Sequence, residues 1–231
     1  MNDLNLVVIG VIAGGITGLS GVLIGGFTLF FATKVGHKHS KKHATASSLI
    51  TLAYIALLVL CLSLLIAAFL DTLSLENIQA IIIAMPLLVI LLGLLFVRRY
   101  FWHTPLIALA HHKKHVAKQL SRQNALAQPL LTALSLIYAS GLIVLANIVL
   151  LALLGMLSAS SALFWSVPYT IGLITPLYIL TALLSSKTSV AQLLKWQDTT
   201  KGTSYLYIGL WCIFLAWLVL YYAIVNGAYL I

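Results

Sequence analysis

Six long apolar segments without any Asp, Glu, Lys, Arg or His constrain the fold more than any other feature of this chain. They cover residues 6–33, 46–70, 78–97, 129–157, 163–183 and 204–231. A helix that crosses the hydrocarbon core of a bilayer needs about 20 apolar residues. Only 7% of the 231 residues are charged, whereas a soluble domain needs roughly 25% to cover its surface. The sequence therefore predicts an all-α polytopic membrane protein with six transmembrane helices in a single domain over residues 1–231.

The distribution of charge predicts the orientation of these spans. All 13 Lys and Arg residues lie in three of the connecting segments. These basic segments cover 34–45, 98–128 and 184–203. Asp198 is the only acidic residue in them, and Asp3, Asp71 and Glu76 lie at the opposite ends of the spans. Because Lys and Arg accumulate in short cytoplasmic loops, we expect the basic segments in the cytoplasm and both termini outside. The same rule accounts for the net charge of +9, so we expect no nucleic acid as a partner.

Short similar strings at the start of the even-numbered spans indicate an arrangement of three helical hairpins. The strings are Thr51-Leu52-Ala53-Tyr54, Ser135-Leu136-Ile137-Tyr138 and Ser204-Tyr205-Leu206-Tyr207. One interpretation is a duplicated hairpin that descends, turns through a basic segment and returns. The alternative is that Tyr favours the membrane interface and Ser or Thr favours helix starts.

The longest basic segment predicts an amphipathic helix on the cytoplasmic membrane surface. Thr104 and Pro105 are typical of an N-cap and a first helical position, and apolar residues then recur at helical spacing from Leu106 to Leu120. The cationic face of such a helix would meet anionic headgroups. The residues that we expect to bind lipid headgroups are Arg98, Arg99, Lys113, Lys114, Lys118 and Arg122.

All seven histidines lie in the first two basic segments. His39 and His43 would share one helical face, as would His111 and His115, because residues four apart on a helix are neighbours. Two such pairs could hold a transition metal on the cytoplasmic side, and their spacing resembles the histidine boxes of membrane di-iron desaturases. Carboxylates are almost absent from these segments, however, and the surrounding lysines would repel a dication. We expect no cofactor, and a surface whose positive charge increases as the pH falls.

Glycines recur along the first span at intervals of three and four residues and so form one helical stripe. The stripe consists of Gly10, Gly14, Gly18, Gly21 and Gly25. Such a stripe allows another helix backbone to approach closely, and we expect it to pack against a helix of this chain or of a second copy. The string Gly18-Leu19-Ser20-Gly21 resembles the serine motif of rhomboid proteases. That chemistry needs a histidine base within the membrane, and no span contains one, so it is excluded.

The spans lack the ionisable groups that mark most intramembrane sites. Haem held by two histidines, a retinal Schiff base and a proton relay are therefore excluded. The candidates for a solute path are one amide near a span centre and three prolines within spans three and five, namely Asn147, Pro86, Pro168 and Pro176. Prolines free backbone carbonyls that can line a site, but they also produce simple kinks. A buried amide also joins helices.

Three functions of different classes fit this sequence. The first is a non-catalytic integral membrane subunit or scaffold, which packs against partner helices and binds anionic lipid or a cytoplasmic partner through its basic, His-rich segments. The second is a small permease or channel for an uncharged or lipidic solute. The third is a metal-dependent enzyme that modifies lipid at the cytoplasmic face.

The absence of ionisable groups from the spans favours the first of these functions, without enzymatic activity. Its expected partners are membrane lipids and either a second copy of the chain or other membrane subunits. No basic region of a cleaved signal peptide precedes the first span. Since the chain is also short and follows the charge rule, we expect it in the bacterial inner membrane.

Overall fold

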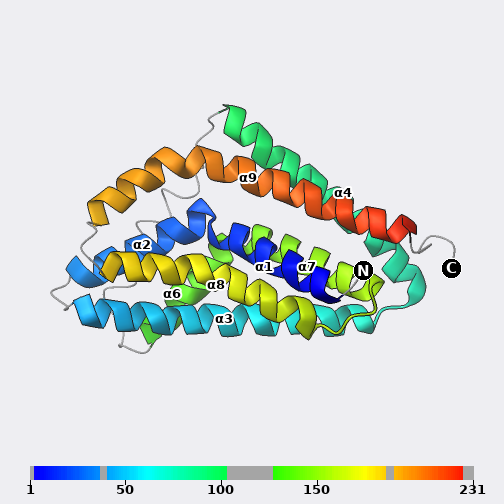
Figure 1. Ribbon diagram of the computed structural model, residues 1–231, viewed down its shortest axis with the longest axis horizontal. Helices are drawn as coiled ribbons and strands as arrows, with labels where there is room; N and C mark the ends of the chain where they lie inside the picture. The colour runs from blue at the N-terminus through cyan, green and yellow to red at the C-terminus, as the bar shows by residue number, and fades with distance from the viewer. Residues whose placement is uncertain (1–2, 37–40, 103–126, 186–189, 226–231) are drawn as a thin grey trace.

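The computed structural model describes residues 3–36, 41–102, 127–185 and 190–225, whose regular structure is entirely helical (Figure 1). The prediction of an all-α protein is confirmed. The helices are α1 (Asp3–Gly18), α2 (Gly21–Gly36), α3 (Lys41–Asp71), α4 (Leu75–Trp102), α6 (Ala127–Ala139), α7 (Gly141–Leu157), α8 (Leu163–Ser185) and α9 (Val190–Val225).

Five helices are long and apolar enough to cross a membrane. Their candidate spans are Lys42–Asp71, Glu76–Phe101, Gln128–Leu157, Leu163–Ser185 and Thr203–Val225. The helices α1 and α2 meet the same test only as a pair, and their axes differ in direction by 56°. The described chain thus contains five such helices, or six if the bent pair forms one span, which is consistent with a membrane protein.

The chain is broken between α1 and α2, whereas the sequence predicted one helix over 6–33. Helix α1 ends with backbone bonds from Leu19 N to the Gly15 oxygen (2.9 Å) and from Ser20 N to the Thr17 oxygen (3.0 Å). The Ser20 hydroxyl oxygen then accepts a bond from Leu23 N at 3.4 Å, the geometry of a serine that caps a new helix. Glycines on both sides of Leu19 and Ser20 lower the helical propensity locally by about 1 kcal/mol each.

The prolines do not interrupt their helices. Helix α4 continues through Pro86, and α8 continues through Pro168 and Pro176. A proline removes one backbone hydrogen bond of its helix. The long apolar segments before and after each proline keep their other backbone hydrogen bonds, so the helix continues.

Helix α9 begins at Val190, so the third basic segment, predicted as a loop over 184–203, is largely helical. The prediction used charge alone. No glycine or proline stands between Val190 and Lys201, so nothing in the local sequence ends a helix there, and a helix longer than the bilayer core projects beyond it.

Helix α7 lies at the centre of the bundle, and most of its residues are buried. Helix α1 packs on α8, and α3 packs on α6 and α8. Helix α4 lies at the periphery beside α9 (Figure 1). These two helices cross at a pair of glycines, because a Cβ atom on Gly93 would lie 2.7 Å from the Gly209 carbonyl oxygen, and the reverse distance is also 2.7 Å.

The helices of the first half of the chain, α1–α4, run opposite to the corresponding helices of the second half, α6–α9. The halves differ at their first element, since α1 and α2 meet at a bend of 56° whereas α6 and α7 together form one apolar span, Gln128–Leu157. In Figure 1, α1–α2 runs from right to left and α6–α7 from left to right, and the later pairs oppose each other in the same way.

Candidate ligand cavity beside the broken span

The first three glycines of the predicted stripe lie against α8. A Cβ atom on Gly14 would overlap the Tyr169 carbonyl oxygen, and one on Gly18 would overlap the Leu173 carbonyl oxygen. From the opposite side, Gly172 of α8 approaches the backbone of α1 equally closely. The two backbones therefore touch along this seam, which holds the end of α1 at a defined position beside the break.

Two of the candidate path prolines belong to the same seam. A Cβ atom on Gly10 would lie 3.2 Å from the Pro168 side chain, and a Cβ atom on Gly18 would lie 3.2 Å from the Pro176 side chain. Pro86 is buried in α4. None of these prolines lines the cavity described below.

A cluster of uncharged polar side chains joins four helices next to the break. Asn147 Nδ2 of α7 donates to Thr17 Oγ1 of α1 at 3.2 Å and to the Ile143 carbonyl oxygen at 2.9 Å. Tyr169 of α8 donates its hydroxyl to the same Thr17 oxygen at 3.5 Å. Trp211 Nε1 of α9 donates to Asn147 Oδ1 at 3.1 Å. Thr17, Asn147 and Tyr169 are almost fully buried, so these bonds satisfy groups that have no access to solvent.

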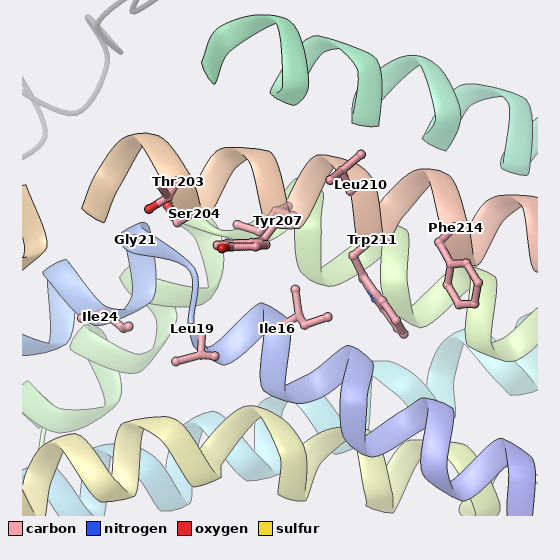
Figure 2. A pocket seen from close by; sticks show the side chains of 11 residues that line it. Ile16, Leu19, Gly21, Ile24, Thr203, Ser204, Tyr207, Leu210, Trp211 and Phe214 are labelled. Carbon is pink, nitrogen blue, oxygen red and sulfur yellow. The ribbon is translucent and has the colours of Figure 1, made fainter. Parts of the chain in front are cut away.

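A cavity of about 670 Å³ separates α9 from the break between α1 and α2 (Figure 2). This volume lies in the range of small-molecule sites, roughly 300 to 1,000 Å³. Its lining residues are Ile16, Leu19, Gly21, Ile24, Thr203, Ser204, Tyr207, Ile208, Leu210, Trp211 and Phe214. Figure 2 shows the Trp211 indole reaching from α9 toward α1, so that this ring forms one wall of the cavity while its N–H holds Asn147.

The cavity occupies about half the depth of a membrane span. Thr203 is the first residue of the apolar span of α9, and Phe214 follows three turns later. At 1.5 Å per residue this stretch is about 16 Å long, against about 30 Å for a hydrocarbon core. The hydroxyl-bearing residues Thr203, Ser204 and Tyr207 are at the start of this stretch, and only apolar residues and Trp211 follow.

One cationic side chain, Arg99, lies near the polar end of the cavity, and a second, Lys34, lies farther along α2. The Arg99 guanidinium lies 5.2 Å from the ring centroid of Tyr205, the second residue after Thr203. Lys34 lies 5.8 Å from the Phe30 ring and donates to the side-chain oxygen of Gln128. Partial burial lowers the pKa of Lys34.

The other predicted site residues are more dispersed. Gly21 lines the cavity and Gly25 is half-buried in α2. Arg98 is exposed near the end of α4, and His43 is exposed at the start of α3. The remaining candidates for headgroup or metal binding lie outside the described residues, and are Lys113, Lys114, Lys118, Arg122, His39, His111 and His115. Within the described ranges, no group of three His, Cys, Asp or Glu side chains could hold a metal ion.

Sequence reasoning identified Asn147 but not its partners or the cavity. Thr17, Tyr169 and Trp211 are ordinary residues in apolar helices, and nothing local marks them as neighbours. One local signal for the break was present, since Ser20 followed by Gly21 is a typical helix start.

Comparison of the chain with protein-family models, curated proteins and solved structures gives no match. Any assignment of function therefore depends on the geometry of this site.

Proposed function

We propose that this protein is an integral membrane permease or carrier for a lipidic or uncharged solute, which it binds in the cavity between α9 and the break in the first span. The observation that carries the proposal is the cavity itself. It is large enough for a small molecule and lies where a span is discontinuous, against a cluster of uncharged polar side chains. Discontinuous helices form the substrate sites of many transporters.

The opposed order of the two halves supports this proposal. Internal repeats of inverted direction are a common architecture of secondary transporters, in which the substrate lies at the interface between repeats. The cavity lies between such elements, because α1–α2 belongs to the first half and α9 to the second. Among the residues whose side chains the structure describes, the lining contains no ionisable group except the Tyr207 phenol, which favours a solute without charge on the part that enters the bilayer.

The membrane arrangement that goes with this function has six spans, with α1 and α2 as one bent span and both termini outside. In Figure 1 the C-terminal ends of α2 and α8 and the N-terminal ends of α3 and α9 lie toward one end of the bundle, and the N-terminal end of α1 and the C-terminal end of α9 lie toward the other. The first group of ends flanks basic segments, which supports a cytoplasmic location for them. A bacterial inner membrane fits this arrangement.

The test is solute flux in liposomes that contain the purified protein. The probes are glycerol, followed by light scattering, and lysophosphatidylglycerol with a fluorescent label, a single-chain lipid with an anionic head, followed by quenching from outside. We expect wild-type protein to accelerate the movement of at least one probe. Leu210→Trp, which enlarges a side chain of the cavity lining, should remove this acceleration, whereas Leu57→Trp on the outer face of α3 should keep it. Both leucines are about half exposed, so the variants are matched. Wild-type flux equal to that of empty liposomes for both probes would overturn the proposal.

A second function, the membrane scaffold, has one observation of its own. Helix α4 packs on α9 and presents a long row of exposed apolar side chains away from it, including Leu87, Leu88, Leu91, Leu94 and Leu95. Such a face suits either lipid or a partner helix. Native mass spectrometry from mild detergent distinguishes the two cases, because a scaffold should keep a second protein chain bound and a monomer with lipid alone would contradict it.

A further inference from the structure

The shape of the cavity narrows the class of ligand. We propose that the ligand is a single-chain amphiphile with an anionic head, of the fatty acid type, which enters from the cytoplasmic leaflet. Its head would lie at the end formed by Thr203 and Ser204, and its alkyl chain would run past Leu210 and Trp211 to Phe214. This inference rests on the function proposed above and specifies its substrate.

The length of the cavity supports a ligand that belongs to one leaflet. Over the described side chains of α9, the cavity extends from Thr203, where the apolar span Thr203–Val225 starts, to Phe214, a length of about 16 Å. An acyl chain of one leaflet covers this same depth, since a leaflet is half of a core of about 30 Å. A compact polar solute would leave most of this length unfilled.

The polarity of the lining changes along the same axis. Thr203, Ser204 and Tyr207 bring hydroxyl groups at the outer end, where a carboxylate could accept hydrogen bonds from them. Leu210, Trp211 and Phe214 follow along α9. In Figure 2, Trp211 and Phe214 point toward α1, where Ile16 lies, whereas Leu210 points away from α1. An amphiphile would match this change in polarity if its head lay beside Thr203 and Ser204 and its alkyl chain lay beside Trp211 and Phe214.

The charges near the outer end favour an anionic head. Arg99 lies over Tyr205 at the depth of Thr203, and Lys34 and Arg98 also lie at the ends of spans that lead into basic segments. The acidic side chains that the structure describes are Asp3, Asp71 and Glu76, which lie at the opposite ends of the spans. Among the described side chains, a cationic head would therefore meet repulsion here and an anionic head attraction.

Photolabelling of the reconstituted full-length protein tests this orientation. Two fatty acids carry a diazirine, one beside the carboxylate and one at the end of the chain, and a third probe is an alkylamine with the diazirine at the chain end. Mass spectrometry of peptides maps the labelled residues. We expect the first probe to label the stretch from Thr203 to Tyr207 and the second to label Trp211, Phe214 or Ile16. The alkylamine should label these residues about fivefold less.

The matched variants separate the cavity from bulk lipid. Leu210→Trp should lower labelling of Phe214 about tenfold, which corresponds to a tenfold loss of affinity for the fatty acid. Leu57→Trp should leave this labelling unchanged. Labelling of α3 equal to that of α9, the same labelled residues for both fatty acids, or equal labelling by the alkylamine would each overturn the inference.

The outcome also distinguishes the two proposals. If Leu210→Trp removes flux of glycerol while the fatty acids label no cavity residue, the permease stands and the ligand class is wrong. If the fatty acids label the cavity in the expected order while no probe moves across the bilayer, the ligand class stands and transport is wrong.

Discussion

The indole N–H of Trp211 lies 3.1 Å from Asn147 Oδ1 and joins the wall of the cavity to the most buried helix of the bundle. Through Asn147 this contact continues to Thr17, two residues before the break in the first span. The position of α9 is therefore coupled by hydrogen bonds to the end of α1. A movement that separates α9 from the end of α1 would therefore have to break this contact.

Replacement of Asn147 by Leu should destabilise the protein by about 1 to 2 kcal/mol, because the partly buried Trp211 N–H loses its acceptor. Thermal unfolding in detergent measures the loss. Trp211→Phe removes the donor instead, and the double variant should be less destabilised than the sum of both, with a coupling of roughly 0.6 kcal/mol. Strictly additive effects would mean that the bond contributes nothing to stability.

The seam between α1 and α8 offers a comparison of two adjacent glycines. A methyl group on Gly14 would overlap the Tyr169 carbonyl, whereas the nearest atom to one on Gly15 is the Gly172 oxygen at 4.0 Å. Gly14→Ala should lower the free energy of unfolding by about 2 kcal/mol or more, as overpacking against backbone does. Gly15→Ala should be neutral or stabilise by up to about 1 kcal/mol through helical propensity. Equal effects at both positions would contradict the close approach seen in the structure.

Ala159 has a positive φ of 52° in the turn after α7, and the following Ser160 N–H donates to the Gly155 oxygen at 2.9 Å. This conformation costs a residue with a Cβ atom about 1 kcal/mol. Ala159→Gly should therefore raise the free energy of unfolding by a similar amount. The matched variant Ala68→Gly, at an exposed site in α3, should lower it by about 1 kcal/mol. Destabilisation by both changes would show that the turn is not strained.

Cysteine labelling tests the orientation in the membrane. Asn77→Cys at the start of α4 and His43→Cys at the start of α3 are exposed positions at opposite ends of the spans. Both are made in a chain whose native cysteines, exposed Cys61 and buried Cys212, are replaced by alanine. In intact cells, an impermeant maleimide should react with Asn77→Cys, and with His43→Cys only after permeabilisation. Reaction of both from outside would refute the arrangement with both termini outside.

Local composition was sufficient to predict most of the helices. Helical structure within apolar segments depends on backbone hydrogen bonds that have no alternative partner in lipid, so α3, α4 and α8 include the predicted ranges 46–70, 78–97 and 163–183. The same reasoning does not locate the ends of helices that project beyond the bilayer. Charged residues end the segment that can lie in the membrane, but they do not end the helix. Helix α9 shows this, since it starts at Val190.

The glycine stripe shows where local reasoning ended. Its regular spacing predicted one packed face, yet Gly14 and Gly18 touch α8 while Gly21 lines the cavity. The 56° bend between α1 and α2 separates the two groups, and the spacing of residues on an ideal helix contains no information about a bend.

The sequence by itself determined that the chain is helical, apolar and asymmetric in charge, since these properties follow from residue types and their order. Only the tertiary structure decided which side chains meet. Asn147 is 130 residues from Thr17 and 64 residues from Trp211 along the chain. Their contact depends on how four helices pack, and packing between apolar helices is decided by the shapes of whole surfaces, which short sequence patterns do not specify.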